Sequence, residues 1–321
     1  MILEDARKAG PPMNHLDVGL DKGFSKTNLA VVDLDGHVLL ETRIGHFCYA
    51  SERCLTHKHL LQLIGYHLVP FMTYPLHCFG HVGTTQGFFD GLHSHGLDVR
   101  SLEAFNDTHL HYGLSEMPGN AITVACGSYW NAMYYDGANN VHCFAGDIWQ
   151  EIPWSFSGIA FARFLLAWWQ DTDCPLTLRD DIVACTGLSA RQLQDHIDPA
   201  LSLDALYPAR WLALGPLVSR YANEERVSMF LSQGNSQLRH LYDRFCAQVH
   251  PPSAPALVLG GSIWSAPIFE QIQARLAAEG ILVVRSQGNP ARGAIRFRRA
   301  HPRAQLEPWA QHLTLECLED E

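Results

Sequence analysis

Short runs of alternating apolar and polar residues recur along the chain, and turns that contain glycine separate them. In the first of these units, residues 16–36, two apolar runs at residues 16–20 and 29–32 flank a polar turn that begins at Asp21. A period of two on both sides of a short glycine-containing turn is typical of a β-hairpin. Residues 38–40 predict a third strand that follows the hairpin.

A second strand–turn–strand unit lies near the middle of the chain. Its strands are predicted over residues 121–126 and 130–135, and the turn between them carries Gly127 and Ser128. The chain therefore contains the same strand–turn–strand arrangement twice. We interpret this as an internal duplication of α/β units that each begin with a hairpin.

The remaining elements follow from helical or strand periodicity. Residues 157–241 are expected to be mostly helical, and they include a buried helix over residues 161–169. Further helices are expected over residues 57–68, 268–276 and 290–297. Further strands are expected over residues 76–79, 101–105, 256–259 and 281–284, and the strand at 281–284 is expected to be the last one in the chain. Expected N-caps are Thr186 and Ser189, and a glycine-rich loop is expected at Gly80, Gly83, Gly87 and Gly91.

The composition excludes several classes of protein. A length of 321 residues suggests two domains, and no apolar run reaches the roughly 18 residues of a membrane span. The net charge of −10 argues against nucleic acid or an anionic membrane as the partner. The nine cysteines lack CxxC pairs and the N-terminus lacks a secretory apolar segment, so we expect reduced thiols and a cytoplasmic protein. The 18 histidines lack metal-ligand spacing, and we expect no structural zinc site.

The tip of the first hairpin carries groups that suit phosphate chemistry. Asp21 can hold Mg²⁺ through water, and the amides of Gly23 and Ser25 can face phosphate oxygens. Ser25 or Thr27 can add a hydroxyl donor. An ordinary solvated hairpin explains this segment equally well when it is taken alone.

Four segments of this kind stand at the ends of predicted strands, where open α/β sheets bind ligands. They are residues 21–27, Asn106-Asp107, residues 125–128 and residues 260–262. In this order they resemble the sugar kinase, heat-shock cognate and actin superfamily, and within it the N-acetylglucosamine kinase and BadF/BadG-type ATPase family. The family motif of the form DGGGTKT aligns without a gap with residues 21–27, its later aspartate with Asp33, and its late PAxGAA element with residues 290–294.

The resemblance implies an α/β fold of two ribonuclease H-like, actin-like ATPase domains with a nucleotide cleft between them. We expect these domains over residues 1–118 and 119–321, with the last helix packing back on the first domain. The implied activity is ATP-dependent phosphoryl transfer to a sugar hydroxyl, with Mg²⁺, on an amino sugar such as N-acetylglucosamine. Relatives in the family are often dimers, so a homodimer is also expected by analogy.

The resemblance also implies roles for individual residues. Asp107 is the expected catalytic base, Asn106 and Asp107 are expected at the sugar, and Asp21 is expected to orient hydrated Mg²⁺. Trp154 is a further expected sugar contact, because sugars stack on aromatic rings. Expected contacts of ATP are Gly23, Ser25, Lys26, Thr27, Gly127, Ser128, Gly260, Gly261 and Ser262. At Gly260 and Gly261 a Cβ is expected to collide with the adenosine. Further candidates for substrate contact are Trp149, His46 and His81, and Asn106-Asp107 has the alternative role of capping the next helix.

The chain departs from the family pattern at three places. Lys22 and Phe24 replace glycines of the first loop, Ala125-Cys126 replaces the Gly-Thr of the second, and residues 153–158 lack both acids of the family's GDEGSG stretch. These departures favour an alternative, a nucleotide-binding ATPase or degenerate regulator without sugar kinase activity. A filament-forming actin relative is a third alternative, although the chain lacks evident insertions for polymer contacts.

Overall fold

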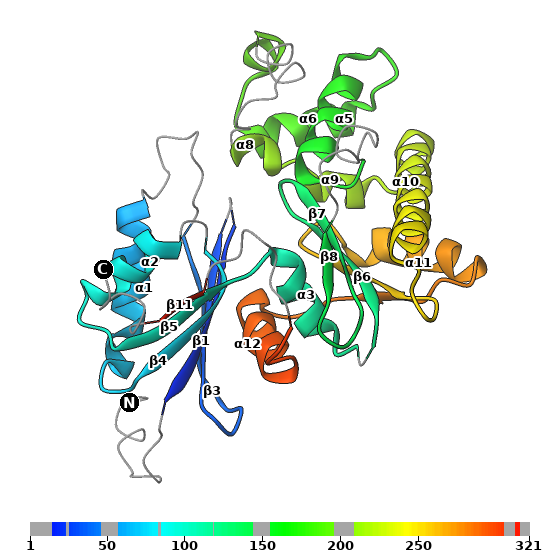
Figure 1. Ribbon diagram of the computed structural model, residues 1–321. Coiled ribbons are helices and arrows are strands. Elements are labelled where there is room, and N and C mark those ends of the chain that lie inside the picture. The colour runs from blue at the N-terminus through cyan, green and yellow to red at the C-terminus, as the bar shows by residue number, and fades with distance from the viewer. Residues whose placement is uncertain are drawn as a thin grey trace.

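The computed structural model describes residues 15–23, 26–45, 57–82, 85–117, 119–143, 155–195, 209–304 and 312–314. Two mixed β-sheets with surrounding helices form two α/β units that lie side by side (Figure 1). The order of strands is β11-β5-β4-β1-β2-β3 in the first sheet and β10-β9-β6-β7-β8 in the second. This is the two-unit α/β architecture that the sequence predicts. Among the described residues, none of the helices combines the length and the apolar character that a membrane span requires.

The first sheet begins with the predicted hairpin. Its strands are β1 (Leu16–Lys22), β2 (Thr27–Val32), β3 (Val38–Ile44), β4 (Leu76–His81), β5 (Val99–Ala104) and β11 (His312–Thr314). β1, β2 and β3 are antiparallel neighbours, whereas β1, β4 and β5 run parallel, so a helix is needed in each connection between the parallel strands. The helices α1 (His57–Leu68) and α2 (Thr85–His93) provide these connections and cover one face of the sheet (Figure 1).

The second sheet repeats the plan and carries a larger helical layer. Its strands are β6 (Ala121–Cys126), β7 (Trp130–Tyr135), β8 (Val141–Cys143), β9 (Ala256–Gly260) and β10 (Val283–Arg285). The helices are α5 (Gly158–Gln170), α6 (Leu176–Thr186), α8 (Ala209–Leu212), α9 (Gly215–Arg220), α10 (Glu225–Val249) and α11 (Ala266–Ala278). The buried apolar side chains of these helices pack with Ile122, Val124 and Leu257 of the sheet into one core.

Two helices lie between the sheets, and each packs on the sheet opposite to the one whose strand precedes it in the chain. The helix α3 (Asp107–Ser115), which follows β5 of the first sheet, packs on β6 and β9 of the second. The helix α12 (Pro290–Ala300), which follows β10 of the second sheet, packs on β1, β2 and β4 of the first (Figure 1). The last long helix therefore returns to the first unit, and β11 after it adds an edge strand there by pairing with β5.

Glycines permit this close packing. A Cβ on Gly19 of β1 would lie 1.9 Å from the carbonyl oxygen of Ala291, and a Cβ on Gly293 would lie 1.9 Å from that of Leu110. Real Cβ atoms do not approach a carbonyl so closely, so the contact of α12 with β1 requires glycine at position 19 and its contact with α3 requires glycine at position 293. This gives the segment a structural role whether or not a ligand is bound.

The predicted elements appear with three corrections. The expected glycine-rich loop is wrong, because Gly80 lies in β4 and Gly87 and Gly91 lie in α2, while Gly83 is outside the described residues. Thr186 ends α6 instead of starting a helix, and its hydroxyl donates to the carbonyl of Ile182 at 2.8 Å. Ser189 does cap the next helix, since its hydroxyl oxygen accepts from the amide of Gln192 at 3.3 Å. The last predicted strand, residues 281–284, is the shorter β10 and is followed by β11.

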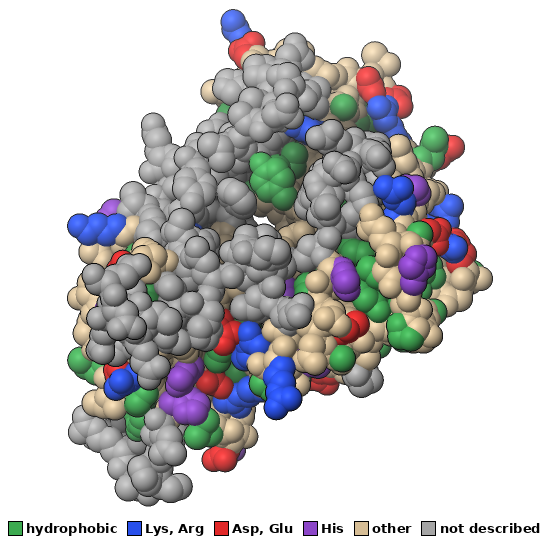
Figure 2. Space-filling view, viewed as in Figure 1, with side chains coloured by type: hydrophobic (Ala, Val, Ile, Leu, Met, Phe, Trp, Pro, Cys, Tyr) green, Lys and Arg blue, Asp and Glu red, His purple; other side chains and the backbone are tan. Residues whose placement is uncertain are grey.

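Figure 2 shows that the described charged side chains on one face are of both signs and are interspersed. The described part of this face therefore offers no broad basic patch of the kind that binds a phosphate backbone.

Candidate active site

A cavity of about 1010 Å³ lies between the two units, at the carboxyl ends of the parallel strands. Its wall includes both hairpin turns. It also includes the start of α3, where the chain enters the second unit, and the loop before α12, where the chain returns to the first. The lining residues are Asp21, Gly23, Lys26, Asn28, Glu41, Thr42, Arg43, His81, Asn106, Asp107, His111, Ala125, Cys126, Gly127, Ser128, Tyr129, Trp130, Asn131, Gly261, Ser262, Arg285, Ser286, Gln287, Gly288, Asn289 and Pro290. Open α/β sheets bind ligands at this end, and the volume suits more than one small molecule.

A row of four polar side chains crosses the first sheet at the cavity. Asp21 of β1 is in register with His81 of β4 on one side and with Asn28 of β2 on the other, and Asn28 is in register with Arg43 of β3. Residues in register point to the same face of a sheet, and all four line the cavity. Asn28 Nδ2 donates a hydrogen bond of 2.8 Å to Asp21 Oδ2, which fixes the carboxylate of Asp21 in place.

Asn106 and Asp107 stand where β5 gives way to α3. Asn106 is the N-cap of the helix, and its side-chain oxygen accepts from the amide of Thr108 at 3.1 Å, as the capping alternative predicted. Asp107 is the next residue and also lines the cavity, so capping and a role in the cavity coexist in this pair.

Asp107 is half-buried, and its carboxyl oxygen Oδ1 is buried and incompletely paired. Its Oδ1 has no hydrogen-bond partner among the described residues. Burial raises the pKa of Asp107 to about 6, and the nearby carboxylate of Asp21 adds to this, whereas the proximity of His81 lowers it. A carboxyl group with a pKa near 6 exchanges its proton close to neutral pH, which suits a general base.

The predicted phosphate-binding amides divide into two groups. Gly23 and Gly127 line the cavity, but their N–H groups close the two turns by donating to Lys26 O at 2.9 Å and to Tyr129 O at 2.8 Å. The expectation that these two amides face phosphate oxygens is therefore not supported. The amides of Ser128, Gly261 and Ser262 have no acceptor within the described part of the chain, and these residues line the cavity.

Three further predicted contacts are placed by the structure. Lys26 lines the cavity, and burial together with the charge of Arg43 lowers the pKa of its ammonium group. Thr27 is fully buried and does not line the cavity, since alternation along β2 turns it away from the face that carries Asn28. Gly260 does not line it either.

The two glycines of the β9 turn are explained by the protein itself. A Cβ on Gly260 would lie 2.1 Å from Cγ of His111, and a Cβ on Gly261 would lie 1.9 Å from the carbonyl oxygen of Cys126. Gly261 also has a φ of +109°, a conformation that favours glycine. The expected collision with adenosine is therefore not needed to account for either residue.

Several predictions fall on residues outside the described ranges. These are Ser25, Trp154, Trp149 and His46. Their proposed contacts with phosphate or sugar stay predictions.

Part of the cavity wall was not predicted from the sequence. Arg43 and the residues from Arg285 to Asn289 carry no local motif, and they reach the cavity through strand register and chain crossing. His111 follows Asp107 by four residues, so the helical period places both side chains on the same face of α3 and was the available signal. Its Nδ1 lies 3.0 Å from Oγ of Ser286, and burial lowers the pKa of the His111 imidazole to about 4.

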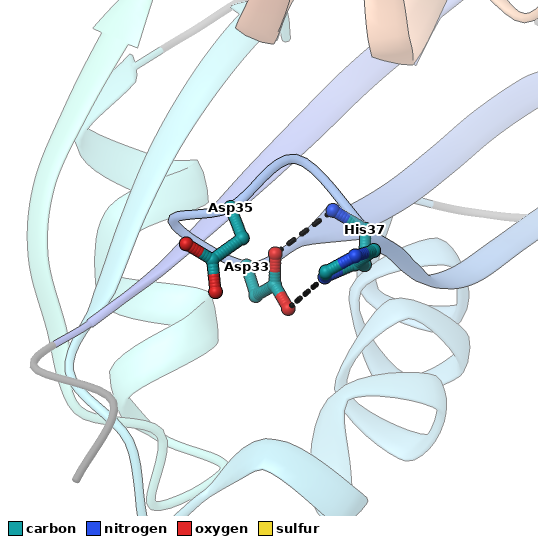
Figure 3. Close-up of side chains that lie close together, drawn as sticks. All are labelled: Asp33, Asp35 and His37. Carbon is teal, nitrogen blue, oxygen red and sulfur yellow. Dashed lines mark hydrogen bonds and ion pairs between the residues drawn. The ribbon is translucent and has the colours of Figure 1, made fainter. Parts of the chain in front are cut away.

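Asp33, which aligned with the later aspartate of the family motif, closes the turn between β2 and β3 and does not line the cavity. Its carboxylate accepts from the amide of His37 at 2.8 Å and contacts the His37 imidazole at 3.1 Å (Figure 3). The ligand atoms of Asp33, Asp35 and His37 lie within 4.8 Å of one another, but these hydrogen bonds already explain the arrangement. We therefore assign Asp33 a structural role.

Comparison with solved structures identifies the architecture. A candidate N-acetylglucosamine kinase from Chromobacterium violaceum superposes with a TM-score of 0.57 at 16% identity, over 89% of this chain and 99% of that one. A candidate N-acetylglucosamine kinase from Porphyromonas gingivalis gives a TM-score of 0.58 at 16% identity, over 88% and 98%. A ROK family glucokinase from Streptomyces griseus, solved with glucose and AMPPNP, gives 0.52 at 14% identity, over 90% and 100%. No family model and no curated protein sequence matches the chain. The chain therefore has the two-domain α/β fold of these kinase structures.

Proposed function

We propose that this protein is an ATP-dependent kinase that transfers a phosphoryl group to a hydroxyl of a sugar. An amino sugar such as N-acetylglucosamine is the first acceptor to test, because two similar structures are described as candidate kinases for it. The observation that carries the proposal is the buried, unpartnered Oδ1 of Asp107 in a cavity that both units line. Such an oxygen needs a hydrogen-bond donor, and an acceptor hydroxyl supplies one.

In this proposal Asp107 acts on the acceptor. Its carboxylate accepts the hydrogen bond of the attacking hydroxyl, orients the oxygen toward the phosphorus atom and takes the proton as the bond to phosphorus forms. Asp107 is ready for this when ionised, which requires a pH above about 6. Phosphoryl transfer depends mainly on positioning and charge, so one well-placed carboxylate is sufficient on the acceptor side.

The residues present fit ATP and Mg²⁺. Asp21 is held by Asn28 with its carboxylate at the cavity, where it would hold hydrated Mg²⁺, and bound Mg²⁺ would neutralise charge on the phosphates. The amides of Ser128, Gly261 and Ser262 are positioned to donate to phosphate oxygens. Lys26 adds a cation at the same wall.

A second function is favoured by the engaged amides of Gly23 and Gly127. With these two donors used inside the turns, the cavity offers fewer backbone contacts to a phosphate chain than the family motif implies. The alternative is a nucleotide-binding ATPase or regulator of the same fold without sugar kinase activity.

One experiment separates the two functions. ADP release is measured with MgATP alone and with a panel of hexoses and N-acetylhexosamines, and AMPPNP binding is measured by calorimetry on the same preparation. A kinase shows release that depends on one added sugar and forms a phosphorylated product detectable by mass spectrometry. AMPPNP binding without any sugar-dependent release would support the alternative, and no AMPPNP binding would contradict both.

A further inference from the structure

On the side of the first sheet, the acidic and basic side chains of the cavity wall differ in whether they have partners within the protein. Two of its acidic side chains have partners within the protein, because Asp21 accepts from Asn28 and Glu41 is paired with Arg292 at 3.5 Å, whereas Oδ1 of Asp107 has none among the described residues. The two basic side chains of the same wall, Lys26 and Arg43, make no hydrogen bond or ion pair with any described residue.

Lys26 and Arg43 are also close enough to repel each other. Lys26 follows the β1–β2 turn, and Arg43 lies in register with Asn28, two residues further along β2. Burial of Lys26 lowers the pKa of its ammonium group most, the charge of Arg43 acts in the same direction, and the carboxylate of Asp21 partly opposes both. A ligand anion held between the two cations would reduce their repulsion further.

We propose that Lys26 and Arg43 form an anion-binding subsite of the cavity that holds a phosphate or carboxylate group of the ligand. Arg43 supplies the planar, bidentate contact that such groups favour, and Lys26 supplies a compact second charge. The identity of the ligand rests on the proposed function, because in a kinase the anion is either the terminal phosphate of the nucleotide or a charged group on the acceptor. The existence of the subsite does not depend on turnover.

The subsite is tested first with inorganic phosphate on the ligand-free protein. Calorimetry or competition at low ionic strength measures phosphate affinity for the wild type, Arg43→Gln, Lys26→Gln and the control Arg296→Gln. The control removes the same charge from α12, where Arg296 pairs with the exposed Glu116 outside the cavity. We expect Arg43→Gln and Lys26→Gln to weaken phosphate binding at least tenfold and Arg296→Gln to leave it within twofold. Equal affinity in all four proteins overturns the proposal.

Two further arms identify the source of the anion. If the subsite holds the terminal phosphate, Arg43→Gln weakens AMPPNP at least tenfold more than ADP. If it holds a group of the acceptor, AMPPNP affinity is unchanged, and phosphate still binds the wild-type AMPPNP complex but not that of Arg43→Gln. Phosphate binding that depends on Arg43 in a protein with no kinase activity would keep the subsite and reject the proposed function. Because Arg43 is exposed on the edge strand β3, folding of the variant is expected and is checked by its thermal midpoint.

Discussion

His111 on α3 contacts Ser286, which follows β10, with 3.0 Å between Nδ1 and Oγ, and its ring fills the space that Gly260 leaves by lacking a Cβ. Residues from the two halves of the chain thus meet in the cavity wall. The first prediction follows from this packing. Gly260→Ala places a Cβ 2.1 Å from Cγ of His111, so we expect unfolding by denaturant to show a loss of about 3 kcal/mol.

The double variant tests the cause of this loss. In Gly260→Ala/His111→Ala the ring is gone, and we expect the alanine at position 260 to cost less than about 1 kcal/mol relative to His111→Ala. Gly119→Ala is the matched control, because nothing lies within 4 Å of a Cβ built there. Equal costs of Gly260→Ala with and without His111 would show that the glycine is needed for another reason.

Asp107→Asn tests the proposed base. The amide keeps the size of the side chain but cannot take a proton, so we expect kcat for sugar phosphorylation to fall by roughly 100- to 10,000-fold. AMPPNP affinity and the thermal midpoint are the controls, and neither is expected to fall. Turnover at the wild-type rate would remove Asp107 from the mechanism.

The raised pKa of Asp107 predicts two pH dependences. A base with a pKa of about 6 is ionised above that pH, so kcat is expected to rise through an acid limb near pH 6. The effect of pH on stability has the opposite sign. A raised carboxyl pKa means that the folded state favours the protonated carboxyl group, so the free energy of unfolding falls as the pH rises. From about pH 4 to about pH 6.5 the wild type should therefore lose about 2 to 3 kcal/mol of unfolding free energy relative to Asp107→Asn.

Parallel urea titrations of the two proteins at several pH values measure this difference, since their other groups titrate alike. A constant difference across the range would mean that Asp107 titrates normally.

The ion pair between Arg299 and Asp17 predicts a large effect on stability. Asp17 is buried on β1, and Arg299 of α12 donates to its Oδ2 at 2.6 Å and to the carbonyl of Asp33 at 2.6 Å. Arg299→Met leaves a buried carboxylate without this partner, so we expect a loss of about 3 to 5 kcal/mol. Arg296→Met, which breaks the exposed pair with Glu116, is the control and is expected to stay within about 1 kcal/mol. Similar losses in both variants would contradict the role given to burial.

Asp21→Asn tests the proposed metal contact. The neutral amide keeps the shape of the side chain but loses the charge that would attract hydrated Mg²⁺. We expect Mg²⁺ to strengthen AMPPNP binding by the wild type and to have a much smaller effect on the variant. Asp35→Asn, in the exposed turn after β2, is the matched control and should respond to Mg²⁺ as the wild type does.

Local patterns predicted most of the secondary structure. The hairpin of β1 and β2 carries its period of two and its turn within about twenty residues, and α1 runs over residues 57–68 as its apolar spacing predicts. The glycines of α2 led to the wrong prediction of a loop, because helix packing explains their small size. A Cβ on Gly91 would lie 2.5 Å from Leu61 of α1. The edge strand β11 has only three residues and is defined by its pairing with β5, so no local pattern in the sequence predicts it.

The cavity was predicted only in part for the same reason. Asp21, Asp107 and Ser128 lie near or just after the ends of apolar strands, a position that the sequence pattern alone predicts. Arg43 reaches the cavity because three pairs of strands share one register, which joins residues far apart in the chain. The engagement of the Gly23 and Gly127 amides depends on the geometry of each turn, which residue types alone do not reveal.

The exchange of α3 and α12, together with β11, means that the polypeptide crosses between the two sheets more than once. Two connections restrict twisting between the units more than a single connection would. We therefore expect the units to move mainly by a hinge-like rotation about an axis near α3 and α12. Such a rotation would narrow the mouth of the cavity around a ligand.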